Sequence, residues 1–139
     1  MHRIYIGLGS NLGNRKKNID EAITRIGERV GTVDRCSSLI ETKPWGFRSS
    51  HDFMNCCIEV RTQLTPRGVL DTTQYIEREL GRHEKSKNGI YHDRVIDIDI
   101  LLYDHVKVDE PDLKIPHPLM LERDFVMKPL KEILPVDRK

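Results

Sequence analysis

Residues 95–104 read VIDIDILLYD, and this stretch predicts a buried β-strand that carries two aspartates on one face. Aspartate is depleted in strands, yet Asp97 and Asp99 stand here between isoleucines. Side chains at i and i+2 share a face, and two rises of about 3.3 Å place the two backbones about 7 Å apart. The isoleucines favour a central strand over an exposed one on which aspartates only add solubility. Two like charges need a positive partner, and carboxylate oxygens bind Mg²⁺ well.

The segments around this stretch complete a β-α-β-β-α-β order. Alternating apolar residues predict earlier strands over 2–9, 32–41 and 53–62. Apolar residues at helical spacing predict one helix that ends at Gly31 and a second that runs from Thr65-Pro66 to Gly81. The pattern over 109–120 is irregular, and a short helix is expected to begin near Phe125 or Met127. The order is that of the ferredoxin-like α+β fold: an antiparallel sheet with helices on one face and the other face free for a site.

Length and composition indicate one soluble globular domain spanning residues 1–139. The 23 basic and 22 acidic residues give a net charge of +1, which argues against a globally basic nucleic-acid binder. We find no apolar run that suits a membrane span and no secretion signal at the N-terminus. Three cysteines, two of them adjacent, are a poor disulfide framework and indicate a reducing cytoplasm. Nothing in the sequence points to an obligate protein partner.

Basic residues gather just before the aspartate strand. Arg82 follows the glycine that ends the second helix, and Arg94 opens the strand, so both are expected at the firm ends of a loop. Arginines near two metal-binding aspartates suit a polyphosphate, because the metal neutralises charge while the guanidinium groups clamp oxygens bidentately. Lys85 and Lys87 lie in mid-loop, and for them a solvated surface is the favoured interpretation.

The first long loop mixes aromatic rings with hydrogen-bonding groups, which suits a flat heterocycle stacked on rings and read at its edge by an amide. These residues are Thr42, Trp45, Phe47, Phe53 and Asn55. A single tryptophan is more often part of a core, so Asn55, expected on a strand among apolar residues, is the stronger indication. His117, between two prolines, suits either a phosphate contact or the cap of a turn. The segment GLGSNLGN lacks the spacing of a P-loop or a Rossmann motif.

Taken together, these motifs resemble 6-hydroxymethyl-7,8-dihydropterin pyrophosphokinase of folate biosynthesis, over roughly residues 4–135. The matching motifs are Gly9-Ser10-Asn11-Leu12, Thr42 to Gly46, Phe53-Met54-Asn55, Glu77 with Gly81-Arg82, Asp93-Arg94 leading into Asp97-Ile98-Asp99-Ile100, Pro116-His117-Pro118 and Arg123-Asp124-Phe125-Val126. The resemblance implies an enzyme that transfers pyrophosphate from ATP to the hydroxymethyl group of the pterin and releases AMP. The substrates are then two small molecules, with no nucleic acid and no membrane involved.

The resemblance also implies roles for individual residues. Asp97 and Asp99 are the expected ligands of two Mg²⁺ ions, and Arg82 and Arg94 are the expected clamps on the ATP phosphates. The expected pterin pocket consists of Gly9, Thr42, Lys43, Trp45, Phe53, Asn55 and Phe125. The expected nucleotide site consists of Leu70, Gln74, Glu77, Arg82, Tyr91, Arg94, Ile100, His117 and Arg123. The sequence departs at three places from patterns that many or some members of the family carry. Tyr91-His92-Asp93-Arg94 stands in place of Trp-Gly-Pro-Arg, Glu84 in place of a second arginine, and Pro118 in place of a tyrosine.

Two rival functions remain at this point. One is a two-metal nucleotidyl transferase that acts on nucleic acid, which would need a basic groove. The other is a non-enzymatic ligand-binding or RNA-binding module, which would carry aromatic residues on its central strands where this sequence has aspartates.

Overall fold

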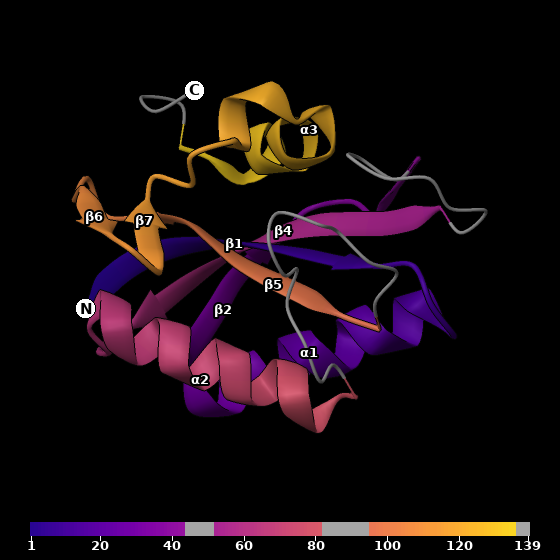
Figure 1. The fold of residues 1–139 in the computed structure, drawn as a ribbon, viewed down its shortest axis with the longest axis horizontal. Helices are drawn as coiled ribbons and strands as arrows, with labels where there is room; N and C mark the ends of the chain where they lie inside the picture. Colours follow the sequence, from indigo (N-terminus) through magenta and orange to yellow (C-terminus); the bar gives the residue numbers. More distant parts are fainter. Residues whose placement is uncertain (44–51, 82–94, 136–139) are drawn as a thin grey trace.

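The computed structural model describes residues 1–43, 52–81 and 95–135, and its main feature is an antiparallel sheet of five strands (Figure 1). Four strands follow the order β2-β4-β1-β5, and β3 pairs with the first residues of β4. The strands are β1 (His2–Ser10), β2 (Gly31–Cys36), β3 (Ile40–Thr42), β4 (Phe53–Thr62) and β5 (Asp97–Tyr103). With two helices in the predicted places, the chain has the α+β ferredoxin-like fold that its sequence indicates.

Two helices, α1 (Arg15–Arg29) and α2 (Pro66–Glu79), cover one face of this sheet (Figure 1). Each helix begins at a residue whose side chain satisfies a free backbone N–H of the first turn. The Asn14 side chain accepts a hydrogen bond from the Lys17 N–H, and Thr65 accepts one from the Gly68 N–H. Pro66 occupies the first helical position, where its missing N–H costs nothing.

The main core lies between these helices and the sheet. Its fully buried members come from β1, β4, both helices and the residue just before β5, as apolar alternation and helical spacing predict. They include Ile4, Ile6, Ile19, Ala22, Ile26, Ile58, Val60, Val69, Ile76 and Ile96.

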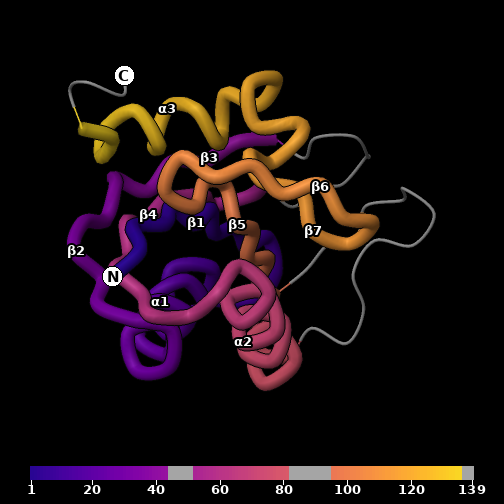
Figure 2. The backbone as a smooth tube through the Cα atoms, turned by 90° about the vertical axis from the view of Figure 1, so that its left-hand side faces the viewer, coloured from indigo at the N-terminus to yellow at the C-terminus, as the bar shows by residue number. Residues whose placement is uncertain are grey.

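A third helix, α3 (Asp124–Ile133), lies on the opposite face of the sheet (Figure 2). Val126 and Leu130 of α3 pack in a second core cluster with Tyr5, Cys57 and Leu101 of the sheet. The sequence predicted a helix in this region but left the second face free. In the structure, α3 covers part of that second face, and a pocket occupies the part beside α3.

β5 is the last strand of the sheet that the described residues form, so the expectation of a central strand is wrong for this part of the chain. The apolar residues that favoured a central position are buried by a different arrangement. Ile98 and Ile100 face the main core on the side of α2, while Leu101 packs in the second cluster. A backbone group of β5 is also satisfied by a side chain of α2. The Glu77 carboxylate accepts a hydrogen bond from the Ile98 N–H at 2.8 Å.

Two further segments differ from the sequence expectation. The strand expected over 32–41 is divided into β2 and β3, because Ser37 leaves the strand path and bonds to Cys57 through both its N–H and its hydroxyl. The irregular stretch 109–120 contains a hairpin of β6 (Val108–Glu110) and β7 (Leu113–Ile115), followed by the short 3₁₀ helix η1 (Met120–Glu122). Pro111 and the acidic residues around it hide the alternation of this hairpin.

The two glycines expected to end helices act differently. Gly81 has a φ of 106° and ends α2 as expected, because this conformation favours a residue without a side chain. Gly31 starts β2, and among the described glycines only Gly13 and Gly81 have positive φ. The lack of a side chain at Gly31 allows close packing, since an added Cβ at Gly31 would lie 1.9 Å from the Arg61 carbonyl oxygen. In the described part of the chain, no helix is long and apolar enough to cross a membrane.

Candidate active site

The site begins with the part of the second sheet face that α3 leaves open. In β1, Gly9 pairs with Asn55 of β4 on one side and with Asp97 of β5 on the other. Gly7, two residues earlier and on the same face, pairs with Asp99. The register therefore places the amide and the two carboxylates around a strip of β1 that carries no side chains. This strip is the floor of a pocket.

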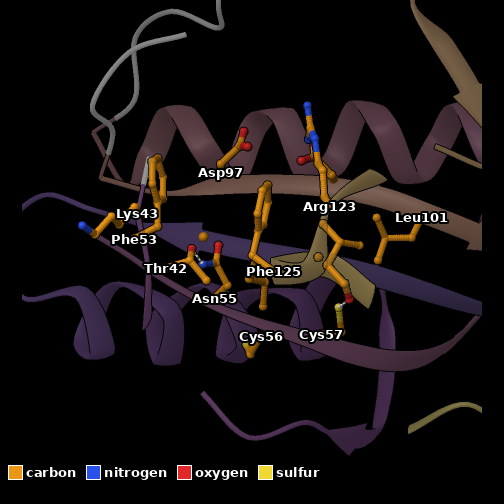
Figure 3. Close-up of a pocket in the computed structure, with 15 residues that line it drawn as sticks. Thr42, Lys43, Phe53, Asn55, Cys56, Cys57, Asp97, Leu101, Arg123 and Phe125 are labelled. Atoms are coloured by element: carbon orange, nitrogen blue, oxygen red, sulfur yellow. Dashed lines mark hydrogen bonds between the residues drawn. The ribbon is translucent and has the colours of Figure 1, made fainter. Parts of the chain in front are cut away.

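This first pocket, which we call the aromatic pocket, encloses about 620 Å³ of space, part of it open to solvent. Phe53 of β4 and Phe125 of α3 stand on either side of it, with Asn55 and Thr42 near its floor and Asp97 across from them (Figure 3). Of the expected pterin residues, the described ones all line this pocket: Gly9, Thr42, Lys43, Phe53, Asn55 and Phe125. Two facing rings with an amide between them can hold a flat polar heterocycle.

Asn55 has a fixed orientation in this pocket. It is 5% exposed, and its Nδ2 donates a hydrogen bond of 2.8 Å to the Thr42 hydroxyl. Its Oδ1 lies against the β1 backbone, 2.9 Å from the place where a Cβ on Gly9 would stand. Oδ1 is the acceptor of this amide, and the bond from Nδ2 to Thr42 fixes the orientation in which Oδ1 can accept a hydrogen bond from the edge of a ligand.

Asp97 and Asp99 lie on the pocket face of β5, as the strand periodicity predicts. Both are partly exposed, whereas the intervening Ile98 is buried on the other face. Both carboxylates line the aromatic pocket. Among the described residues no group of three metal-ligating side chains occurs. Mg²⁺ does not need one, because it commonly binds one or two carboxylates and completes its shell with substrate phosphates and water. The donor set therefore fits a Mg²⁺ ion that binds together with a polyphosphate.

A second hollow, the edge cleft, follows the free edge of β5 and encloses about 700 Å³, again partly open to solvent. Its walls come from α2, β5 and the β6–β7 hairpin with the segment after it. They include Leu70, Gln74, Ile98, Asp99, Ile100, Asp112, Leu113, Lys114, His117 and Pro118. Asp99 lines both the edge cleft and the aromatic pocket. The two hollows therefore meet at Asp99.

The expected nucleotide residues divide between these hollows. Leu70, Gln74, Ile100 and His117 line the edge cleft. His117 fulfils one of its two expected roles, since its Nδ1 accepts a hydrogen bond of 3.3 Å from the Leu119 N–H and caps a turn.

Two other expected nucleotide residues lie elsewhere. Arg123 lines the aromatic pocket, with its guanidinium carbon 5.6 Å from the centre of the Phe125 ring. Glu77 is 3% exposed and lies behind β5, where it holds the strand that carries the aspartates.

Four expected site residues, Arg82, Arg94, Trp45 and Tyr91, lie outside the described residues. The hairpin also brings to the edge cleft two residues that the sequence did not predict as site residues, Asp112 and Lys114. The alternation of Val108, Leu113 and Ile115 around a turn containing Pro111 was the signal that could have revealed them.

Buried thiols form part of the pocket wall. Burial raises the pKa of Cys57 to about 12, and its Sγ contacts the Val126 carbonyl oxygen at 3.7 Å. A thiol with so high a pKa is protonated at neutral pH and chemically inert. Cys57 therefore contributes packing, and the polar groups that the pocket offers a ligand include the carboxylates of Asp97 and Asp99 and the amide of Asn55.

Comparisons with known proteins agree with this geometry. The model of the family described as 7,8-dihydro-6-hydroxymethylpterin-pyrophosphokinase (HPPK) matches residues 5–135. A 2-amino-4-hydroxy-6-hydroxymethyldihydropteridine pyrophosphokinase of Porphyromonas gingivalis is 49% identical over 133 residues, which are 95% of this chain and 90% of that protein. A protein of the same name from Aquifex aeolicus is 40% identical, over 97% of this chain and 82% of its own length.

The fold also matches a solved structure. A crystal structure of an HPPK-DHPS in complex with substrates superposes with a TM-score of 0.74 at 14% identity. The match covers 96% of this chain and 40% of that longer one. At this identity the superposition bears on the fold alone. The family model and the close relatives establish that this chain belongs to the 7,8-dihydro-6-hydroxymethylpterin-pyrophosphokinase family.

Proposed function

We propose that this chain transfers the pyrophosphoryl group of ATP to the hydroxymethyl group of 6-hydroxymethyl-7,8-dihydropterin and releases AMP. The reaction is that of the family. One observation supports its location at this site: the aromatic pocket and the edge cleft meet at Asp99. One hollow suits a flat heterocycle and the other suits a nucleotide. Their junction carries the carboxylates that a polyphosphate with Mg²⁺ requires.

The aromatic pocket positions the acceptor. Phe53 and Phe125 stack on the two faces of the pterin, and the Asn55 Oδ1 accepts a hydrogen bond from its edge. The hydroxymethyl group then extends toward Asp97 and Asp99, where the triphosphate enters from the edge cleft. Holding the two reactants in line supplies much of the rate, because phosphoryl transfer needs little covalent help from the protein.

Asp97 and Asp99 would hold the metal, for which we propose two Mg²⁺ ions. Bound there, the ions supply charge neutralisation on the phosphates during transfer. We assign Arg82 and Arg94, which follow α2 and precede β5 in the sequence, to the same phosphates.

We propose a reducing compartment such as the cytoplasm for this chain, which the free thiols of Cys36, Cys56 and Cys57 support.

A product assay tests this proposal. We expect AMP to form from ATP and Mg²⁺ only when hydroxymethyl-dihydropterin is present, and we expect added RNA or DNA not to replace the pterin. A purified chain that forms no AMP under these conditions would refute the activity. AMP formation with an unchanged rate in Asp99→Asn would leave the activity intact but refute the site.

A further inference from the structure

Asp112 has an unusual setting at the mouth of the edge cleft. It lies in the turn between β6 and β7, and its carboxylate is held by Arg67 of α2, whose Nη1 donates to Oδ2 at 2.7 Å. Arg67 also bonds to Glu110. One guanidinium thus fixes the hairpin against α2 and holds a negative charge beside the proposed nucleotide site.

The direction of the nucleotide in the cleft follows from the proposed function, on which this inference rests. Transfer occurs where the two hollows meet, so the phosphates lie near Asp99. The nucleoside must then extend from Asp99 along the edge of β5 toward the hairpin. Among the described lining residues, Asp99 and Asp112 are the two acidic side chains of the edge cleft. They therefore stand at the phosphate side and the hairpin side of the same nucleotide.

The lining of the edge cleft indicates where the base and the ribose of the nucleotide would lie. The aliphatic side chains of Leu70, Ile100 and Leu113 suit the flat base, which gains by burial. The Asp112 side chain is 65% exposed, so it stands at the solvent side of the cleft. The two vicinal hydroxyls are the polar edge of a ribose, so we expect them at this solvent side, away from the aliphatic walls. A carboxylate only accepts hydrogen bonds, and the hydroxyls donate them.

Asp112 remains able to accept such a bond. Arg67 donates to Oδ2, and a carboxylate has two oxygens with about four lone-pair sites, so Asp112, which lines the cleft, can accept a further hydrogen bond. The hydrogen bond from Arg67 also lowers the pKa of Asp112, so the carboxylate is ionised at neutral pH. The acidic group that receives the ribose hydroxyls in dinucleotide-binding folds works by the same chemistry on an unrelated scaffold.

We infer that Asp112, held by Arg67, accepts a hydrogen bond from a ribose hydroxyl of the nucleotide and makes the enzyme select ribonucleoside over deoxyribonucleoside triphosphates. Asp112 is thus a specificity-determining residue. It contributes nothing to the transfer step itself.

The test compares kcat/KM for ATP, 2′-deoxy-ATP, 3′-deoxy-ATP and inosine triphosphate in the wild type and in Asp112→Ala and Asp112→Asn. A hydrogen bond to a charged group is worth about 1.5–3 kcal/mol, so the wild type should prefer ATP to one deoxy analogue by about 10-fold or more. In Asp112→Ala that preference should fall to within about threefold, because ATP loses the bond while the deoxy analogue has none to lose.

Glu110→Gln is the matched control, since Glu110 bonds to the same arginine but does not line the cleft. It should keep the wild-type preference. A wild type that does not discriminate against either deoxy analogue, or an Asp112→Ala variant that keeps its preference, overturns the inference. A change in the ATP to inosine triphosphate ratio alone would mean that Asp112 contacts the base, and would overturn it too. A wild type that forms no AMP with ATP instead contradicts the proposed activity.

Discussion

Replacing Gly9 with alanine tests the pocket floor most directly. The added Cβ would lie 2.9 Å from Asn55 Oδ1 and 3.5 Å from the nearest Phe53 ring carbon. The first distance is too short, so Asn55 must move. It cannot do so freely, because its Nδ2 bonds to Thr42 at 2.8 Å in a buried setting. The methyl group therefore displaces the amide that we assign to the pterin edge.

The structure sets the expected magnitudes. Crowding of this kind costs about 1–3 kcal/mol of the free energy of unfolding. The displaced amide leaves a pterin donor without its acceptor, which costs about 1–3 kcal/mol of binding free energy, or about 5-fold to 150-fold in pterin Kd. The edge cleft does not contain Gly9, so the Kd of a nonhydrolysable ATP analogue should change by less than about twofold.

Calorimetric titration of pterin and of the ATP analogue into folded Gly9→Ala measures both quantities, and thermal unfolding measures stability. Gly27→Ala is the control, because its Cβ would meet nothing closer than Val33 at 3.9 Å and it lies in α1. That variant should gain about 0.5–1 kcal/mol of stability and keep its pterin affinity. Unchanged pterin affinity in Gly9→Ala would show that the pterin does not lie on this floor.

Three other outcomes are expected. Asp99→Asn should keep its melting temperature but lose turnover by about 100-fold or more, because an amide binds Mg²⁺ far more weakly; steady-state kinetics with varied Mg²⁺ checks this. Gly31→Ala should lose about 3 kcal/mol or more in chemical denaturation, since its Cβ overlaps the Arg61 carbonyl oxygen. A hydrogen bond from Cys56 lowers the pKa of Cys36 to about 7, so alkylation of Cys36, followed by mass spectrometry, should rise with pH through that value.

Most of the fold was predictable because its signals are local. Thr65-Pro66 predicts the start of α2, and the alternation in 97–100 predicts that both aspartates lie on one face. The position of β5 at the edge was not predictable, since burial by α2 and α3 leaves the same apolar pattern as burial by neighbouring strands. The hairpin after β5 was not predicted because its strands have three residues each, so the alternation of Val108, Leu113 and Ile115 is only a weak signal.

The pocket shows a similar limit. The sequence indicates Asn55 and Asp97 separately, but their alignment across Gly9 depends on the register of three strands, and no short-range pattern encodes that register. Likewise, the opposition of Phe53 and Phe125 exists only because α3 returns over the second face of the sheet. Site residues within one strand were therefore predictable, and contacts between distant segments needed the structure.

Because α3 covers only part of the second sheet face, β1 is under two kinds of evolutionary constraint: stability beneath α3 and ligand binding at the pocket floor. At Tyr5, beneath α3, a substitution alters how much folded protein the cell holds, and compensating changes in the helix can restore it. At Gly9, four residues further on, a methyl group alters what the folded protein binds, and no change elsewhere makes room for it as simply. A mutational scan along β1, scored in parallel for abundance and for growth without folate, should therefore switch from one kind of defect to the other within one strand.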